Sequence, residues 1–256
     1  MLFLGDSNTY GVFVDAAQAY PIRFQALWNA LPEVRPIEVL NLGYPGMNSS
    51  RLRNMLPSLL RTMRPDVVLI MVGVNDFWTI PEPIRDIGER ATVGDFLWRI
   101  SRVYRLLILL QRSWHVPQLE VPRVPVDAIP MAGYEATARF GDETFRLGYQ
   151  PMPTGVRGFQ GPLRENLVAL VASVRDSGVQ PVLLTYPSGN PLYQFIDDVI
   201  REAAGESGAT FVDLTPVFAA RCPEWRCEEL LPDQHPSAPG HELAAETLVN
   251  DLRDRL

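Results

Sequence analysis

Positive charge and long apolar runs are both scarce in this sequence, and each shortage excludes a class of function. Lysine and arginine total 23 against 30 acidic residues, which gives a formal net charge of −7. A surface that follows a phosphate backbone needs clustered positive charge, so we expect no nucleic acid partner. No apolar run reaches the roughly 18 residues that are needed to cross a bilayer, so we expect no transmembrane segment. The oligomeric state stays open.

Cysteine is rarer still, since the chain has two, Cys222 and Cys227. Two thiols without a neighbouring histidine do not fill the tetrahedral shell of a zinc ion, so we expect no metal site. The pattern favours two independent thiols in a loop. The alternative is a small disulfide-closed loop before His235, which would indicate an oxidising compartment. No signal peptide is visible before the first motif, but the stretch before Gly5 is short, so a periplasmic or secreted location stays open.

What the chain does have is an alternation of short apolar runs and helical patterns over most of its length. We predict strands at Leu2–Leu4, Ile37–Asn41, Val67–Val72, Val182–Thr185 and Thr210–Asp213. We predict helices at Tyr20–Leu31, Ser49–Met63, Leu163–Asp176, Leu192–Ala204 and about Gly240–Arg255. Apolar strands that alternate with helices indicate an α/β fold with a parallel sheet, in which ligands bind beyond the carboxyl ends of the strands. Hydrophobic residues make up 46% of the chain, which is enough for one sizeable core.

One region, at about residues 78–161, interrupts the alternation because it holds no convincing strand of the central sheet. We interpret it as a mostly helical and irregular insertion after the third strand, inside a single domain that spans residues 1–256. It contains an amphipathic helix at roughly Val93–Leu110, whose apolar residues we expect to pack on the core. The alternative is a lid or a membrane-facing surface. The apolar residues at helical spacing are Phe96, Ile100, Val103, Leu107 and Leu110.

Four short segments carry the side chains that are suited to chemistry. They are Gly5–Gly11, Asn41–Ser49, Gly73–Asp76 and Asp233–Pro236. The first three follow predicted strands, and each segment alone is an ordinary turn. In a parallel sheet, however, the loops after successive strands share one edge. Ser7, the glycines of the second segment, Asn75 and His235 then supply a nucleophile, oxyanion donors and a base in one place.

These segments resemble, in the same order, the sequence blocks of the SGNH/GDSL hydrolase family. GDSNTYG resembles the nucleophile block with Ser7, and GVND resembles the asparagine block with Asn75. In NLGYPGMNS, Gly46 matches the oxyanion glycine of the family better than Gly43 does, and the segment with His235 resembles the final block. The matched parts are roughly residues 1–78 and 162–256. The resemblance implies a flavodoxin-like three-layer α/β/α sandwich with five parallel strands in the order 2-1-3-4-5.

The resemblance also implies acyl transfer through an acyl-enzyme, with Ser7 as the nucleophile and His235 as its general base. The backbone N–H groups of Ser7 and Gly46 and the amide of Asn75 would bind the oxyanion. No metal or organic cofactor is needed. We expect the substrate to be a short acyl ester, acetyl-like, of a polar or carbohydrate alcohol. The alternatives are an O-acyltransferase with the same site, a long-chain lipase or thioesterase, and a non-catalytic carbohydrate-binding module.

The final block departs from the family pattern in its spacing. The family has an aspartate three residues before the histidine, where this chain has Pro232, whereas Asp233 is only two residues before His235. We expect Asp233 to orient His235 nonetheless, and the alternative is a dyad or a carbonyl partner. Of the two other histidines, we expect His115 to be a surface residue and His241 to be a polar residue of the first turn of the last helix.

Several polar residues flank these candidates. We expect Asp6 and Asp76 to hold turns by hydrogen bonds and Asp213 to be structural. Our candidates for substrate binding are Asn8, Asn48 and Trp78. We also consider Trp78, Phe77 and Tyr134 as platforms on which a sugar ring could stack, against the simpler interpretation that they belong to the core.

Overall fold

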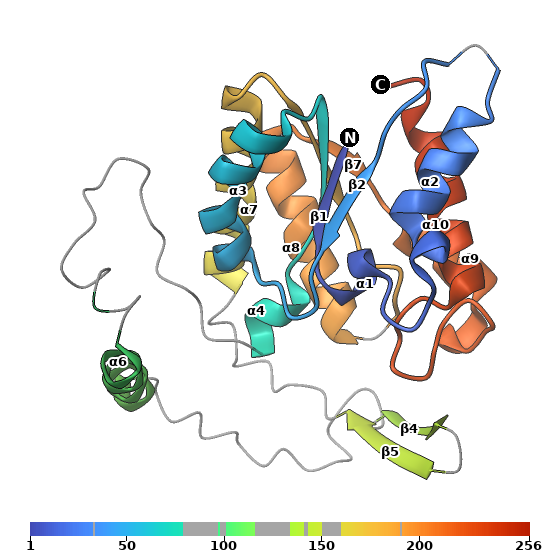
Figure 1. Ribbon diagram of the computed structural model, residues 1–256. Helices are drawn as coiled ribbons and strands as arrows, with labels where there is room; N and C mark the ends of the chain where they lie inside the picture. The colour runs from blue at the N-terminus through green and yellow to red at the C-terminus, as the bar shows by residue number, and fades with distance from the viewer. Residues whose placement is uncertain are drawn as a thin grey trace.

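The central sheet has five parallel strands in the order β2-β1-β3-β6-β7 (Figure 1). The computed structural model describes residues 1–32, 34–78, 97, 101–115, 134–140, 143–149, 160–189 and 191–256. The strands of the sheet are β1 (Leu2–Gly5), β2 (Leu40–Gly43), β3 (Val67–Met71), β6 (Gln180–Leu184) and β7 (Thr210–Val212). When only the strands of this sheet are numbered along the chain, β6 and β7 become the fourth and fifth strands, and the order is 2-1-3-4-5. This order confirms the fold class that the resemblance implies.

Helices cover both faces of the sheet, so the fold has three layers (Figure 1). One face carries α3 (Ser49–Met63), α7 (Gln160–Asp176) and α8 (Pro191–Ser207), and the other carries α2 (Tyr20–Asn29) and α10 (Ala238–Leu252). The connections contain the short helix α9 (Thr215–Arg221) and the 3-10 turns η1 (Ala16–Gln18) and η3 (Pro223–Trp225). Both termini lie at the amino edge of the sheet, away from the loops that carry the motifs (Figure 1).

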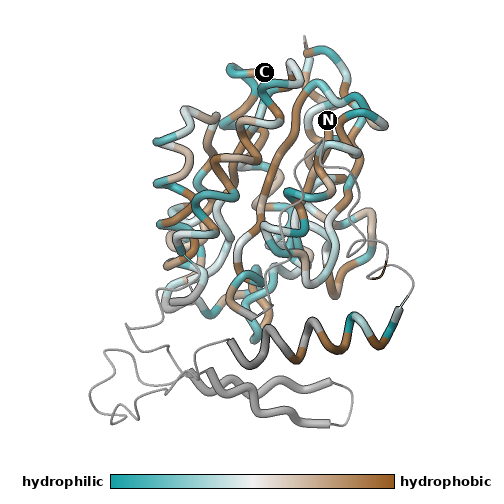
Figure 2. The backbone as a smooth tube through the Cα atoms, turned by 90° about the vertical axis from the view of Figure 1, so that its left-hand side faces the viewer, coloured by the Kyte–Doolittle hydropathy of each residue, from teal (hydrophilic) through white to brown (hydrophobic). Residues whose placement is uncertain are grey.

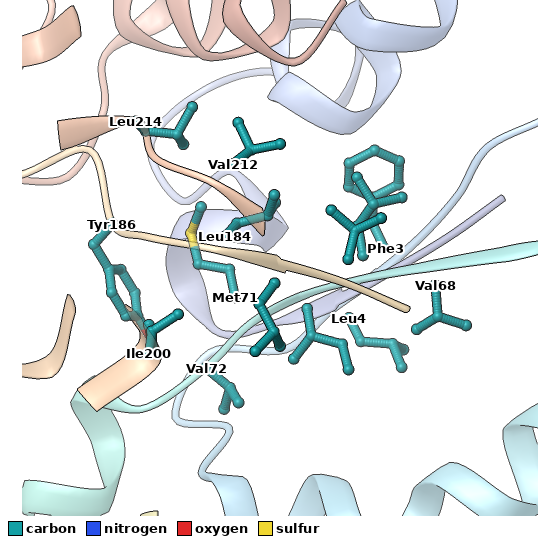
Figure 3. Packing of buried hydrophobic residues seen from close by; sticks show 14 of the residues in the cluster. Phe3, Leu4, Val68, Met71, Val72, Leu184, Tyr186, Ile200, Val212 and Leu214 are labelled. Atoms are coloured by element: carbon teal, nitrogen blue, oxygen red, sulfur yellow. The ribbon is translucent and has the colours of Figure 1, made fainter. Parts of the chain in front are cut away.

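The strands are apolar on both faces because each face meets a layer of helices. Successive side chains of a strand point to opposite sides, and Figure 3 shows Phe3 and Leu4 of β1 directed into the two different layers. Both side chains are almost completely buried. The Phe3 ring packs against the ring of Phe24 in α2, with 5.6 Å between the ring centroids. Burying one such side chain stabilises the fold by about 1.5–3 kcal/mol. Figure 2 shows the same apolar layer running through the centre of the molecule.

The second strand begins later than the sequence predicts, at Leu40 rather than at Ile37. The backbone N–H of Ile37 donates to Asn29 Oδ1 at 2.8 Å, and that of Val39 donates to Gln25 Oε1 at 2.6 Å. Side chains of α2 therefore satisfy this stretch of backbone, so it does not need a ladder with β1. Apolar patterning does not reveal such side-chain partners, which explains the error.

Two short helices start at the carboxyl edge of the sheet. They are α1 (Ser7–Tyr10), after β1, and α4 (Val74–Trp78), after β3 (Figure 1). A glycine allows α1 to approach β2 closely, because a Cβ at Gly43 would lie 2.3 Å from the backbone nitrogen of Tyr10. The packing of Gly43 against α1 brings the loops after β1 and β2 together.

The insertion contains three described elements, α6 (Arg102–His115), β4 (Tyr134–Phe140) and β5 (Glu143–Tyr149). β4 and β5 form an antiparallel hairpin, which the sequence analysis did not predict, and neither strand joins the central sheet. α6 overlaps the end of the helix predicted at 93–110. Residues 93–96 and 98–100, and with them Phe96 and Ile100, lie outside the described residues.

The described residues of the apolar stripe on α6 are exposed and do not pack on the core, contrary to our expectation. Val103 is 67% exposed, Leu107 57% and Leu110 47%, and Leu106 joins them at 56%. Helical spacing indicates that one face of a helix is apolar, but it does not say which surface covers that face. Among the helices that the structure describes, none is long and apolar enough to span a membrane.

Cys222 and Cys227 form a disulfide, with their Cα atoms 5.1 Å apart, which confirms the small closed loop before His235 and not the two independent thiols. The chain reverses between them, because η3 follows Cys222 and the backbone N–H of Trp225 donates to Cys222 O at 2.8 Å. Glu229 lies close to both sulfur atoms, but a disulfide offers no thiolate to a metal ion.

Candidate active site

Ser7 is the first residue of α1 and stands directly beyond the carboxyl end of β1. Asp6 precedes it and caps the helix, because the Asp6 carboxylate accepts a hydrogen bond from the backbone N–H of Asn8 at 2.9 Å. The hydroxyl of Ser7 lies 2.8 Å from Nε2 of His235, although the two residues are far apart in the sequence. The structure thus brings together the two residues that the sequence analysis placed at the centre of the chemistry.

Asp233 is the second partner of His235. The Asp233 carboxylate lies 3.0 Å from Nδ1 of the imidazole and also accepts the backbone N–H of His235 at 3.1 Å. The shortened spacing works because Gln234, between them, has a left-handed backbone with φ of 70°. This conformation is uncommon outside glycine, and here it folds the Asp233 side chain back onto the ring that follows.

Gln234 is itself held in place, and sequence reasoning missed it. Its side chain is buried, accepts a hydrogen bond from Ser188 Oγ at 3.5 Å, and donates to the carbonyl of Trp225 at 3.3 Å. The turn is closed by the backbone N–H of Leu231, which donates to the carbonyl of His235 at 2.8 Å. These contacts fix the imidazole relative to Ser7. A buried glutamine between two polar residues leaves no local signal in the sequence.

The electrostatics keep Asp233 charged. Burial alone would raise the pKa of its carboxyl, but the hydrogen bonds and the charge of His235 outweigh burial and hold that pKa below its ordinary value. A serine hydroxyl bonded to an imidazole whose other nitrogen faces a carboxylate is an arrangement that can activate the hydroxyl for attack on a carbonyl.

Gly46 lies in the loop after β2, and Asn75 lies in the first turn of α4 after β3. Gly46 has φ of 80°, and a Cβ built there would meet no atom within 4 Å. Gly43, in contrast, is packed against α1. Asn75 donates from Nδ2 to the carbonyl of Met47 at 3.0 Å, which ties α4 to the loop that carries Gly46.

The structure places the three candidates for substrate binding differently. Asn8 is buried and donates from Nδ2 to the Asp6 carboxylate at 3.1 Å. Asn48 is also buried and caps α3, where its Oδ1 accepts the backbone N–H of Arg51 at 2.9 Å. Both side chains therefore support turns beneath the surface. Trp78 ends α4, and its side chain lies outside the described residues, as does that of Tyr134.

Asp6 belongs to a buried network that joins the loops after β1, β3 and β6. The hydroxyl of Tyr186 donates to Asp6 Oδ2 at 2.6 Å and accepts the backbone N–H of Val74 at 3.2 Å. Burial raises the pKa of Asp6, although the hydrogen bonds from Tyr186 and Asn8 oppose the shift. Tyr186 thus connects the turn of Ser7 to the helix of Asn75. The sequence analysis missed Tyr186, although its place just after a predicted strand was a signal.

Asp76 holds the start of α3, as expected of a turn-forming residue. Its carboxylate accepts the backbone N–H of Ser49 at 2.8 Å and the hydroxyl of the same serine. Burial raises the pKa of Asp76 to about 6, against the effect of these bonds. Asp213 is likewise structural, since it accepts hydrogen bonds from Thr185 Oγ1 and from the guanidinium of Arg201 at 2.9 Å each.

His241 does not take part in this arrangement. It is 1% exposed, and its Nδ1 accepts the backbone N–H of Tyr20 at 3.1 Å. Burial lowers the pKa of His241 to about 4, so the ring is neutral at neutral pH. It is thus a buried helix residue and not merely a polar residue of the first turn. The side chain of His115 lies outside the described residues.

Comparison with known proteins identifies a family model that matches most of the chain. The model of the GDSL-like lipase/acylhydrolase family matches residues 3–243 of the chain. No curated protein sequence matches this chain.

Several solved structures share the fold. The acetylxylan esterase Axe2 from Geobacillus stearothermophilus has a TM-score of 0.58 and 20% identity, over 98% of this chain and 92% of that one. TesA has a TM-score of 0.58 and 17% identity, over 100% and 98%. The psychrotrophic esterase EstA from Pseudoalteromonas sp. has a TM-score of 0.55 and 16% identity, over 99% and 96%. A serine-to-alanine and a histidine-to-alanine variant of Axe2 are both described as catalytic mutants.

Proposed function

The chain belongs to the GDSL-like lipase/acylhydrolase family and is a serine carboxylic ester hydrolase, and we propose that it cleaves short acyl esters of a polar or carbohydrate alcohol. The observation that carries the proposed mechanism is the chain of hydrogen bonds from Ser7 through His235 to Asp233. The family match crosses the insertion, which supports our further proposal that residues 1–256 form one domain with an insertion at about 78–161.

In the proposed mechanism, His235 takes the proton from Ser7 Oγ as that oxygen attacks the ester carbonyl. Asp233 holds the imidazole in the tautomer that accepts this proton at Nε2 and stabilises the imidazolium that forms. The tetrahedral intermediate then expels the alcohol, which receives the proton from His235. Water attacks the acyl-enzyme while His235 takes its proton, and the carboxylic acid leaves as Ser7 regains its hydrogen.

We assign the oxyanion hole to the backbone N–H groups of Ser7 and Gly46 and to the amide of Asn75. Ser7 is the first residue of α1, so its backbone N–H has no partner within the helix. Gly46 lies on an open loop, and the bond from Asn75 to Met47 holds that loop beside α4. Donors that are fixed before the reaction are worth more than mobile ones, because they need no reorganisation as charge develops.

The substrate proposal has two supports. The acetylxylan esterase from Geobacillus stearothermophilus shares the fold, and its catalytic mutants replace a serine and a histidine. The end of α1 and the loops after α1 and β2 also expose three aromatic side chains, which suit the apolar face of a sugar ring: Tyr10 at 53%, Phe13 at 60% and Tyr44 at 52%. The polar residues Asn8, Thr9, Asn48 and Ser49 give no support, because all four are buried.

One observation favours a second candidate, a long-chain lipase or thioesterase. The exposed apolar face of α6 is the kind of surface that a long acyl chain would cover. Each buried CH₂ of such a chain would then add about 0.8 kcal/mol of binding.

A serine variant tests the mechanism. Ser7→Ala should lower kcat for p-nitrophenyl acetate by about 10⁴-fold or more, because it removes the proposed nucleophile that forms the acyl-enzyme. A fluorophosphonate probe should label the wild-type protein and not the variant. Retention of more than a tenth of the wild-type kcat in a folded variant would overturn the assignment.

A series of acyl lengths tests the substrate class. We expect kcat/KM, measured from acetyl to palmitoyl esters of one alcohol below the micelle threshold, to be highest for the shortest chains. A steady rise beyond about eight carbons would instead reflect the roughly 0.8 kcal/mol per CH₂ of an apolar channel and would promote the second candidate. Product analysis with a sugar acceptor separates hydrolysis from acyl transfer.

A further inference from the structure

Phe13 is an unusual residue at the edge of the candidate site. Its side chain is 60% exposed, and its backbone has φ of 72°. A left-handed backbone is uncommon for any residue other than glycine and is a clear outlier for a bulky one. Asparagine or glycine would adopt the same φ more readily. A large apolar side chain that is exposed on strained backbone therefore has no evident benefit for folding, and strain of this kind clusters at functional sites.

The loop that carries Phe13 is fastened to the helix of Ser7. The backbone N–H groups of Gly11 and Val12 both donate to the carbonyl of Ser7, at 3.1 and 3.2 Å. The N–H of Val14 donates to Gly11 O at 3.3 Å, so bonds lie on both sides of Phe13. Gly11 is buried, with φ of 84°, and a Cβ there would lie 2.7 Å from that of Ala19. The position of Phe13 relative to the nucleophile is thus set by the backbone.

The ring of Phe13 lies edge-on to His235, with 5.8 Å between the ring centroids and 83° between the planes. The imidazole side chain is 18% exposed and faces Ser7 through Nε2. In the mechanism proposed above, this imidazole delivers its proton to the alcohol that leaves. The leaving alcohol must therefore depart past the imidazole, next to the exposed ring of Phe13.

We infer that Phe13 is a specificity-determining residue that binds the leaving alcohol, and that it selects alcohols with a ring that has an apolar face. A pyranose ring and a phenyl ring both present such a face, and an aromatic contact of this kind is worth up to about tenfold in affinity. The inference rests on the proposed function, because it takes the direction of departure from the role of His235. It adds the residue that selects the alcohol half of the ester.

The test compares acetates that differ in the alcohol alone: methyl acetate, benzyl acetate and an acetylated methyl xyloside. The measured quantity is the ratio of kcat/KM for each ring-bearing ester to that for methyl acetate. Phe13→Asn keeps the left-handed backbone without strain and removes the ring, and it should lower at least one ratio about tenfold, mainly through KM. Phe13→Tyr keeps the ring and should keep the ratios. Whichever ratio falls identifies the ring as sugar or aromatic.

Met63→Asn is the matched control, since Met63 is an exposed apolar residue, 40% exposed, at the far end of α3 near the opposite edge of the sheet. It should keep both ratios. The inference is overturned if Phe13→Asn keeps wild-type ratios, or if Phe13→Tyr loses them as fully as Phe13→Asn. It is also overturned if Phe13→Asn slows all three acetates equally, because the ring would then act on His235 and not on the alcohol.

A binding measurement separates this inference from the proposed function. Nuclear magnetic resonance titration of Ser7→Ala with benzyl alcohol and with methyl xyloside reports the subsite without turnover. Adding Phe13→Asn should weaken binding of the favoured alcohol about tenfold. If the wild-type protein hydrolyses none of the acetates but this loss is observed, the proposed function fails and the alcohol site stands. If binding of both alcohols is unchanged, the inference fails whatever the activity.

Discussion

Two neighbouring regions, the loop Leu230–Pro236 and the first turn of α10, each contain a histidine. The two histidines differ in burial and in hydrogen-bond partners. His235 stands in the loop with its two ring nitrogens facing Ser7 and Asp233, at 2.8 and 3.0 Å. His241 is buried in the helix and has one backbone partner, the N–H of Tyr20 at 3.1 Å. The same side chain is thus a candidate catalyst in one region and a part of the core in the other.

The difference lies in what surrounds each ring. The loop provides a charged carboxylate and partial access to solvent, both of which allow an imidazole to gain a proton during turnover. The helix removes water without offering a negative charge, so burial lowers the pKa of His241 to about 4 and keeps the ring neutral. Catalytic ability therefore follows from the neighbours of a histidine and not from its place in the sequence.

Replacing the two histidines should give the largest contrast. His235→Ala should lower kcat for p-nitrophenyl acetate by about 10⁴-fold, because it removes the proposed general base. His241→Asn should keep kcat near the wild-type value, since Oδ1 of asparagine can accept the same N–H. Circular dichroism checks that both variants fold. An inactive His241→Asn protein with a native spectrum would contradict the contrast.

A smaller effect should follow when the carboxylate beside His235 is neutralised. Asp233→Asn should lower kcat by about 10³-fold, because an amide can hold the imidazole in the wrong tautomer. The steady-state rate at saturating ester, between about pH 6 and pH 9, measures this loss. A near-normal rate would show that Ser7 and His235 act as a dyad.

The smallest effect concerns stability and should distinguish His241 alone. Its pKa is lower in the folded state than in the unfolded state, so the unfolded chain binds the proton first as the pH falls. This contribution to stability is complete above the unfolded pKa of about 6.5 and is lost as the pH falls towards 4. Between pH 7 and about pH 4.5, wild-type protein should lose about 2 kcal/mol more of its unfolding free energy than His241→Asn.

Urea denaturation at the two pH values measures this difference. The raised pKa of Asp76 acts in the opposite direction, because stability from a carboxyl with a raised pKa is lost as the pH increases. It is common to both proteins and cancels in the comparison. Equal losses in wild-type protein and His241→Asn would show that burial of His241 is not coupled to folding.

Much of the fold could be predicted, because parallel strands that are covered on both faces leave short apolar runs in the sequence. The predicted helix Ser49–Met63 has the bounds of α3, and all five predicted strands overlap strands of the sheet. The errors occur where contacts between residues that are distant in the sequence determine the structure. Side chains of α2 satisfy the backbone before β2, and the apolar face of α6 is exposed although its spacing is typical of a helix that packs on a core.

In the candidate site, too, some features could be predicted from the sequence and others depend on contacts between distant residues. The sequence by itself indicated which edge of the sheet carries the candidates, because Ser7, Gly46 and Asn75 follow strands whose carboxyl ends share one edge of a parallel sheet. Only the tertiary structure decided how they are held and what surrounds them: the left-handed backbone of Gln234 and the bridge from Tyr186 to Asp6. The physical reason is the distance along the sequence over which the interacting residues are separated. Strand and helix patterns arise from local periodicity, whereas a backbone torsion at one residue or a buried hydrogen bond between distant loops depends on the assembled fold.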